Sequence, residues 1–342
     1  MSACHDHPSH GWDREGRGGR IGPAMLDQAQ LLELHHWVTV TRAVDERLWT
    51  LSRQGRAGFV LTARGHEVAQ VASVGAMRIG HDSAWPYYRD LGVGIAMGVS
   101  PYEVFLGALR RGSDPHSGGR QLTAHFSSRE LRLGSISSEV GAHLPHAAGA
   151  AYASTVLGDD SVALCWFGDG AASEGAAHEA MNFAAVHRLP VVFICENNGL
   201  AISVPAELQA AAPIAARAAG YGMAGATLDG TDGDAVYDAT TIAVERARGG
   251  EGPSLLEMHV PRMVPHSSQD DDRYRSDDER AAAAARDPLA RLRSRLVSDC
   301  ILDEGGIERE VEAVAAAVRA DLERALAEPE RDGQRYHEWM HS

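Results

Sequence analysis

Short apolar runs alternate with longer amphipathic stretches through the middle of the chain, and this alternation predicts an α/β fold. The apolar runs that we expect to form strands are residues 162–167, 191–195, 226–228 and 254–259. The stretches between them that we expect to form helices are residues 173–187, 214–219 and 235–248. Wholly apolar strands that alternate with helices are typical of a parallel sheet with helices on both faces.

More helices are expected on either side of this core. Residues 26–52 carry apolar side chains at roughly helical spacing, and the glycine-containing stretch 54–58 ends the pattern. The other predicted helices cover residues 67–77 and 91–97, a segment starting at Ser100-Pro101, and residues 140–155 and 281–326. Residues 111–134 have little periodicity, and so long an irregular stretch in a compact domain usually indicates a functional loop.

No internal repeat and no strong linker divides the chain. The simplest organisation is one large domain with a helical appendage at its C-terminal end. We therefore expect a disordered polar tail at residues 1–24, the main domain at 25–280 and a helical C-terminal region at 281–342.

Composition narrows the class of protein. Of the 342 residues, 44% are hydrophobic and 23% are charged, which is typical of a globular protein with an ample core. A net charge of −15 disfavours a nucleic-acid partner, and no apolar run is long enough to span a membrane. The N-terminal segment lacks the apolar centre of a signal peptide, and the four cysteines show no paired spacing. These features predict a cytoplasmic protein with reduced thiols.

Two predicted strands end abruptly in small residues, which are either glycines or have side chains with oxygen atoms. Gly168-Asp169-Gly170 follows the first of them, and Asn197-Asn198 follows the second, so Asn198 stands 29 residues after Asp169. That separation is one helix plus one strand, and the carboxyl ends of neighbouring parallel strands meet at one edge of the sheet. An Asp and an Asn there could hold Mg²⁺, while a helix start could bind phosphate. The pattern predicts a clamp for a metal-bound diphosphate.

This pair of motifs resembles the thiamin-diphosphate binding motif. The stretches 167–175 and 197–203 look like the alpha subunit of the 2-oxo acid dehydrogenases, in their decarboxylating first component. Residues 119–126, with Ile136-Ser137-Ser138, are similar to the branched-chain (2-oxoisovalerate) members. The resemblance runs from about residue 31 to about residue 297. It implies the thiamin-diphosphate-binding fold.

The resemblance assigns roles to particular residues. It implies that Mg²⁺ binds the side chains of Asp169 and Asn198 and the backbone carbonyl of Leu200, where the family usually has Tyr. Catalytic roles fall to His266 and His125. The residues implied to contact the cofactor are Tyr88, Arg89, Ser138, Asp169, Gly170, Ala171, Asn198, Ala201, Ile202 and His266.

A second cation is less well supported. Residues 137–143 resemble a K⁺-binding loop of the branched-chain enzymes, but Ala142-His143 replaces the Thr-Gln expected at its end. Two oxygen ligands are therefore missing, and this argues against a K⁺ site.

The resemblance implies an enzyme that decarboxylates 3-methyl-2-oxobutanoate on thiamin diphosphate and passes the acyl group to a lipoyl acyltransferase core. It also implies an α₂β₂ heterotetramer, because the glutamate that activates the cofactor belongs to the beta subunit. Pyruvate and acetoin dehydrogenase alpha subunits remain alternatives, and Glu196 before the Asn pair favours them slightly. A non-catalytic scaffold of the same fold is a further alternative.

Overall fold

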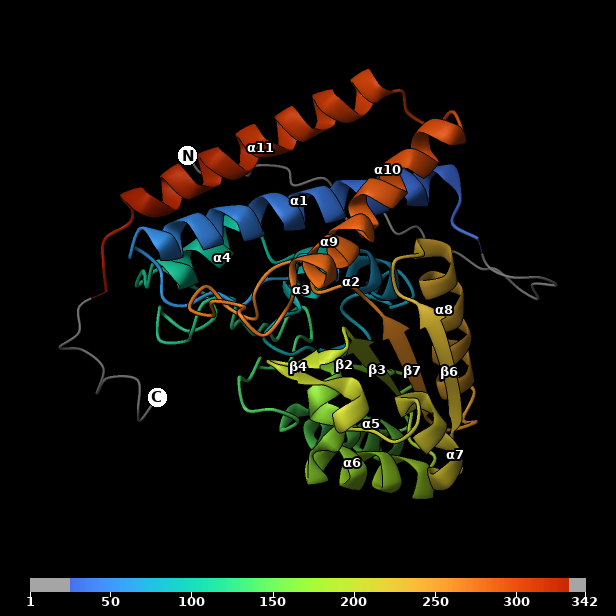
Figure 1. Ribbon diagram of the computed structural model, residues 1–342. Coiled ribbons are helices and arrows are strands. Elements are labelled where there is room, and N and C mark those ends of the chain that lie inside the picture. The colour runs from blue at the N-terminus through green and yellow to red at the C-terminus, as the bar shows by residue number, and fades with distance from the viewer. Residues whose placement is uncertain (1–24, 332–342) are drawn as a thin grey trace.

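The structure, a computed structural model, describes residues 25–331 (Figure 1). Its centre is a parallel five-stranded sheet in the order β1-β2-β3-β7-β6. These strands are β1 (Ser83–Trp85), β2 (Ala163–Gly168), β3 (Val191–Asn197), β7 (Ser254–His259) and β6 (Ala224–Asp229). The predicted α/β fold with a parallel sheet is confirmed.

Helices cover both faces of the sheet, as the apolar strands require. One face lies under α2 (Glu67–Val74) and α8 (Gly233–Arg248), backed by α1 (Gln28–Arg53) and α3 (Leu91–Met97). The other face is covered by α5 (His143–Leu157), α6 (Gly175–Val186) and α7 (Arg217–Tyr221). Figure 1 shows this second layer beneath the sheet, on the side away from α1.

Alternate side chains of the central strands enter two separate cores. Leu164 and Trp166 of β2 join the core on the α1 side, whereas Cys165 and Phe167 join the core under α5 and α6. Each is fully buried. Because both sides of β2 are buried, polar groups can enter this region only where the strand ends, which is why the chemistry collects at the sheet edge.

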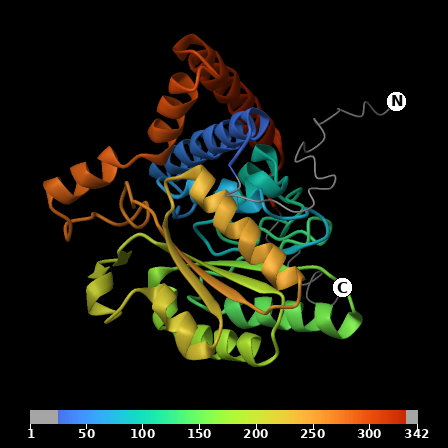
Figure 2. The same ribbon diagram turned by 90° about the vertical axis from the view of Figure 1, so that its right-hand side faces the viewer.

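The C-terminal helices pack back onto the start of the chain. After α9 (Asp277–Ala285), which buries none of its residues, come α10 (Pro288–Ser298) and α11 (Glu304–Ala327). Figures 1 and 2 show α11 lying along α1, beside α4 (Pro101–Ala108). Leu289, Leu292 and Leu296 of α10 are buried. The division into a main domain and a C-terminal region stays a prediction, and the predicted tail lies outside the described residues.

The sequence pattern missed the smallest elements. Strand β1 has only three residues, too few to show any periodicity. The hairpin of β4 (Leu200–Ala201) and β5 (Val204–Pro205) was likewise not predicted. Residues 214–219 form a 3₁₀ turn (Ile214–Ala216) that continues into α7. Within the described part of the chain, no helix is both long and apolar enough to cross a membrane.

Candidate active site

The ends of β2 and β3 bring the two predicted motifs together. Gly168 pairs with Glu196 in the parallel register, so Asp169 and the Asn197-Asn198 pair follow side by side at the same sheet edge. A cavity of about 510 Å³ opens there. The residues predicted to bind cofactor or metal all line it: Tyr88, Arg89, Ser138, Asp169, Gly170, Ala171, Asn198, Leu200, Ala201, Ile202 and His266. Their individual roles stay predictions.

Asp169 has the features of a cation ligand. Its side chain is buried, and its Oδ2 atom has no hydrogen-bond partner. Burial raises the pKa of this carboxyl above its ordinary value, while the backbone N–H groups of Asp169 and Asn198 act in the opposite direction. A buried carboxylate oxygen without a partner is costly unless something positive binds it. The donor set therefore fits a hard divalent cation.

The hairpin after β3 presents further oxygen atoms and a close backbone approach. Asn198 Oδ1 accepts a hydrogen bond from the N–H of Leu200 at 3.2 Å. A Cβ added to Gly170 would lie only 2.9 Å from the Cβ of Ala201, so a side chain there would collide with the hairpin. Gly170 is therefore required for the 3₁₀ turn Asp169–Ser173 to pass close to β4, where its backbone also faces the cavity.

Arg89 and His266 meet on the cavity wall. Arg89 Nη1 donates to the carbonyl of Thr62 at 2.7 Å, and Nη2 lies 3.2 Å from His266 Nδ1. Burial, with the positive charges of Arg89 and Arg262, lowers the pKa of His266 to about 4. The imidazole is therefore neutral at physiological pH, and its Nδ1 accepts from Arg89, which leaves the proton on Nε2. A neutral imidazole and a guanidinium side by side suit a phosphate ligand or a proton transfer.

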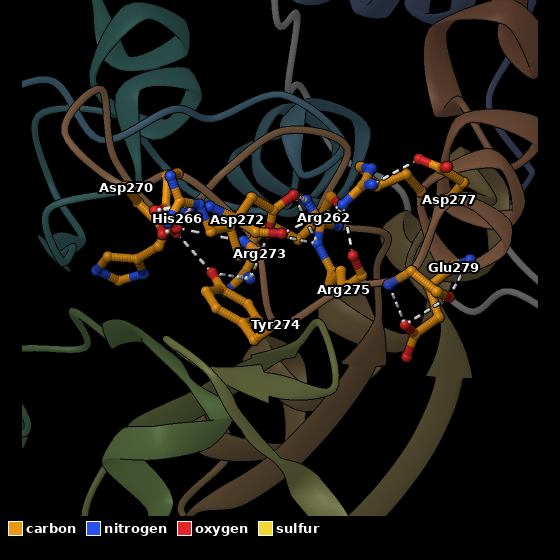
Figure 3. A network of polar contacts seen from close by, with 12 residues as sticks. Arg262, His266, Asp270, Asp272, Arg273, Tyr274, Arg275, Asp277 and Glu279 are labelled. Carbon is orange, nitrogen blue, oxygen red and sulfur yellow. Dashed lines mark hydrogen bonds and ion pairs between the residues drawn. The ribbon is translucent and has the colours of Figure 1, made fainter.

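A polar network fixes the loop that carries His266 (Figure 3). Asp270 Oδ2 accepts the backbone N–H of His266 at 2.8 Å and the hydroxyl of Tyr274 at 2.5 Å. Arg262 Nη2 donates to Tyr274 Oη at 2.7 Å, and Nη1 donates to the carbonyl of Ile202 at 2.8 Å. Figure 3 shows the His266 ring pointing away from these contacts. The network joins the His266 loop to the β4–β5 hairpin on the other side.

Arg275 holds the far end of the same loop. Its guanidinium binds the buried carboxylate of Asp272, with Nη2 2.5 Å from Oδ2, and donates through Nη1 to the carbonyl of Arg262 at 2.6 Å. Both charges are almost completely buried and paired, so removing either one would leave an uncompensated buried charge in this loop.

His125 lies behind the cavity rather than on its surface. Its Nδ1 is 3.0 Å from the carbonyl of Thr123, and its Nε2 is 2.6 Å from the hydroxyl of Ser138. A carbonyl can only accept, so Nδ1 carries the proton and Nε2 accepts from Ser138. Burial lowers the pKa of His125 and keeps it neutral. In this structure His125 would act on a ligand through Ser138, which lines the cavity.

The 137–143 loop does not offer a monovalent cation the ligands that the resemblance would require. His143 is buried, and its Nε2 donates to the carbonyl of Trp166 at 2.6 Å. Burial lowers its pKa to about 4, so the ring is neutral. Neither Ala142 nor His143 has a side-chain oxygen, which is the ligand that K⁺ would take from the Thr-Gln pair. The absence of a K⁺ site stays a prediction.

Several residues of the site were not found from the sequence. Phe59, Leu61 and Val140 give the cavity an apolar wall. Phe59 and Leu61 are half-buried residues two positions apart in an irregular segment, an alternation that could have indicated one shared face. His66 is completely buried directly behind Asn198, and only its position before a predicted helix was visible in the sequence.

Comparison with known proteins places this geometry in a family. Residues 35–334 match the family described as dehydrogenase E1 component. The chain belongs to the dehydrogenase E1 component family. Members of this family depend on thiamin diphosphate, and the E1 fold agrees with the parallel sheet and its helical layers.

Curated relatives of this E1 chain carry branched-chain names. It is 40% identical over 306 residues to the 2-oxoisovalerate dehydrogenase subunit alpha of Bacillus subtilis, covering 89% of this chain and 93% of that one. It is 40% identical to the 3-methyl-2-oxobutanoate dehydrogenase subunit alpha of Mycobacterium tuberculosis, covering 88% and 79%. It is 38% identical to the human mitochondrial 2-oxoisovalerate dehydrogenase subunit alpha, covering 85% and 66%. The resemblance seen in the sequence is thereby confirmed.

Proposed function

We propose that this chain is the alpha subunit of a 2-oxo acid dehydrogenase that decarboxylates branched-chain substrates such as 3-methyl-2-oxobutanoate. The observation that carries the proposal is the buried, unpartnered Oδ2 of Asp169 beside Asn198, in a cavity that Arg89 and His266 also line. The names of the relatives support the branched-chain assignment.

In this proposal the chain holds the diphosphate end of thiamin diphosphate. Asp169, Asn198 and the carbonyl of Leu200 bind Mg²⁺, and Arg89 and His266 contact the phosphates. When bound, the cofactor supplies an electron sink for decarboxylation of the oxo acid. His266, neutral and protonated on Nε2, can hold or transfer a proton beside it. The Ser138 hydroxyl is oriented by His125 towards the same space.

The apolar wall supports a branched-chain substrate. Phe59, Leu61 and Val140 offer a hydrocarbon surface, whereas the metal-ligand side of the cavity is polar. A branched aliphatic side chain gains more from such a surface than the methyl group of pyruvate does.

The subunit name of the relatives supports a beta-subunit partner, and we propose an α₂β₂ heterotetramer docked on a lipoyl acyltransferase core. The outer face of α5 and α6 supports the need for a protein partner. Tyr152, Val156, Phe183 and Val186 are 41–70% exposed there, and the rings of Tyr152 and Phe183 lie 5.7 Å apart. A contiguous exposed apolar group of this kind is typical of an interface.

A cytoplasmic location is part of the proposal. The cysteines in the described part of the chain, Cys165, Cys195 and Cys300, are free thiols, as expected in a reducing compartment.

The test is made on the chain reconstituted with its beta subunit. Asp169→Ala should weaken Mg²⁺-dependent thiamin diphosphate binding by about an order of magnitude or more, because a metal ligand is lost. Asp160→Ala is the control, since that carboxylate is exposed, pairs with Arg78 and is not among the residues that line the cavity. Unchanged cofactor binding in Asp169→Ala would refute the metal clamp.

Turnover then separates the alternatives. Wild-type enzyme should have a higher kcat/KM for 3-methyl-2-oxobutanoate than for pyruvate or for acetoin. A preference for either of the latter would assign the chain to that class instead. A non-catalytic scaffold would show no turnover that depends on Asp169.

A further inference from the structure

A buried polar cluster lies directly behind the proposed metal ligand Asn198, between β3 and the start of α2. Its centre is Glu196, two residues before Asn198 on β3 and completely buried. Its Oε2 atom receives three donors: His66 Nδ1 at 2.6 Å, Gln70 Nε2 at 3.2 Å and the Tyr87 hydroxyl at 3.2 Å. A buried carboxyl oxygen needs hydrogen-bond partners, and these three contacts make Glu196 the centre of the cluster.

The direction of each hydrogen bond from Asn198 to Glu196 follows from simple donor and acceptor rules. Asn198 Oδ1 accepts the N–H of Leu200, so the amide nitrogen Nδ2 faces the other way. There it lies 3.4 Å from His66 Nε2, which must accept because an amide NH₂ can only donate. His66 therefore carries its proton on Nδ1, the atom that contacts Glu196. Both contacts select the same tautomer.

Asp90 is a second buried carboxyl group of the cluster. It is completely buried and accepts the backbone N–H of Tyr87 at 2.7 Å and the Nε2–H of Gln70 at 3.1 Å. Burial and the neighbouring Glu196 raise the pKa of Asp90 well above its ordinary value.

We propose that His66 is a positioning residue, which holds the Asn198 carboxamide with Oδ1 towards the cation, and that Glu196 fixes the His66 tautomer needed for this. The inference rests on the proposed function, because the cation is the one assigned to Asp169 and Asn198. A carboxamide can bind Mg²⁺ only through its oxygen, and a rotation that exchanged its two ends would present NH₂ to the metal. A buried imidazole that accepts from Nδ2 opposes this rotation.

The test compares two substitutions of His66 in the reconstituted α–β enzyme. Leucine can neither accept from Asn198 nor donate to Glu196. Glutamine can do both, since its Oε1 can accept and its Nε2 can donate. We expect His66→Leu to weaken Mg²⁺ binding, titrated at fixed thiamin diphosphate, by about 10-fold or more, and His66→Gln to stay within about 3-fold of wild type. At saturating Mg²⁺, the KM for the oxo acid should change little.

Ser73→Ala provides the matched control for general damage to the core. Ser73 lies on the same helix as the cluster and is completely buried, and its Oγ accepts from Trp166 Nε1 at 2.9 Å without contacting the cavity. It should lower the melting temperature without changing Mg²⁺ affinity.

The outcomes separate the inference from the proposed function. If wild-type enzyme binds no Mg²⁺ with thiamin diphosphate, the proposed function fails, and this inference fails with it. If wild type binds the metal and His66→Leu binds it equally well, only the inference is overturned. The inference is also overturned if His66→Gln binds Mg²⁺ as weakly as His66→Leu does, or if Ser73→Ala weakens Mg²⁺ binding as much as His66→Leu does.

Discussion

The Tyr274 hydroxyl should control how firmly the His266 loop is held. Tyr274→Phe removes one oxygen that donates to Asp270 at 2.5 Å and accepts from Arg262 at 2.7 Å. The ring itself can stay in place, with the Arg262 guanidinium 5.5 Å from its centre. The substitution therefore tests the two hydrogen bonds rather than the packing.

The expected magnitude follows from the burial of the partners. Hydrogen bonds to charged groups contribute about 1.5–3 kcal/mol when buried, and less at a side chain that is 36% exposed like Tyr274. Taking about 1 kcal/mol for each, the free energy of local opening should fall by about 2 kcal/mol. Since about 1.4 kcal/mol is a factor of ten, amide exchange in the loop should accelerate roughly 30-fold.

Hydrogen exchange of the α–β enzyme measures this directly. The informative amides are those of His266 and Asp272, because both donate to the Asp270 carboxylate. Tyr102→Phe is the matched control: its hydroxyl donates to Glu328 at 3.0 Å, and Arg324 lies 4.2 Å from its ring centre, far from the cavity. Equal protection of the loop in wild type and Tyr274→Phe, or the same change in Tyr102→Phe, would refute the reasoning.

Three further substitutions test other parts of the structure. His143→Gln should make the enzyme more stable in acid than wild type. Because folding lowers the pKa of His143 from 6.5 to about 4, wild type loses roughly 3 kcal/mol of stability as the pH falls through this window. Melting temperatures of the two proteins that stay parallel from pH 7 to pH 4 would contradict this prediction. Arg42→Met should lower the free energy of unfolding by about 3–5 kcal/mol in chemical denaturation, because the completely buried Glu67 loses its ion pair at 2.5 Å. A denaturation midpoint equal to that of wild type would show that the ion pair does not stabilise the fold. Phe59→Ala should lower kcat/KM for 3-methyl-2-oxobutanoate about 10-fold or more, and should lower kcat/KM for pyruvate by a smaller factor. An equal loss for both substrates would show that Phe59 does not select between them.

The sequence predicted those parts of the fold that local physics determines. Strands β2, β3 and β7 are largely apolar because both of their faces are buried, and this pattern is readable without a structure. Helix α4 begins at Pro101 because Ser100 and Glu103 form a capping box, which depends on a few neighbouring residues only. The juxtaposition of Asp169 and Asn198 followed from strand spacing alone.

The rest of the site depends on contacts between residues distant in sequence. His66 and Glu196 are 130 positions apart, and neither has a local pattern that reveals the other. Arg262 reaches Ile202 across 60 positions, and Phe59 enters the cavity from an irregular segment. Single residues such as these are positioned by the folded sheet edge, so sequence periodicity cannot indicate them, and a family resemblance indicates only those that its motifs contain.

The arrangement around the cavity is costly for the isolated chain, and this cost is itself an argument for a bound group. Asp169 Oδ2, His143 Nδ1 and Arg262 Nε are buried without hydrogen-bond partners, and all three residues lie in or beside the cavity wall. Each such atom costs about 1–3 kcal/mol, a large fraction of the stability of a typical domain. A ligand present at 100 times its Kd stabilises the folded protein by about 2.7 kcal/mol, which is comparable to the cost of one of these unpartnered atoms. A cation held against Asp169 would therefore offset the local cost, and substituting Asp169 by Asn should stabilise the cofactor-free enzyme while weakening its metal site. If Asp169 had a purely structural role, Asp169→Asn would instead destabilise the cofactor-free enzyme and leave its affinity for the metal unchanged.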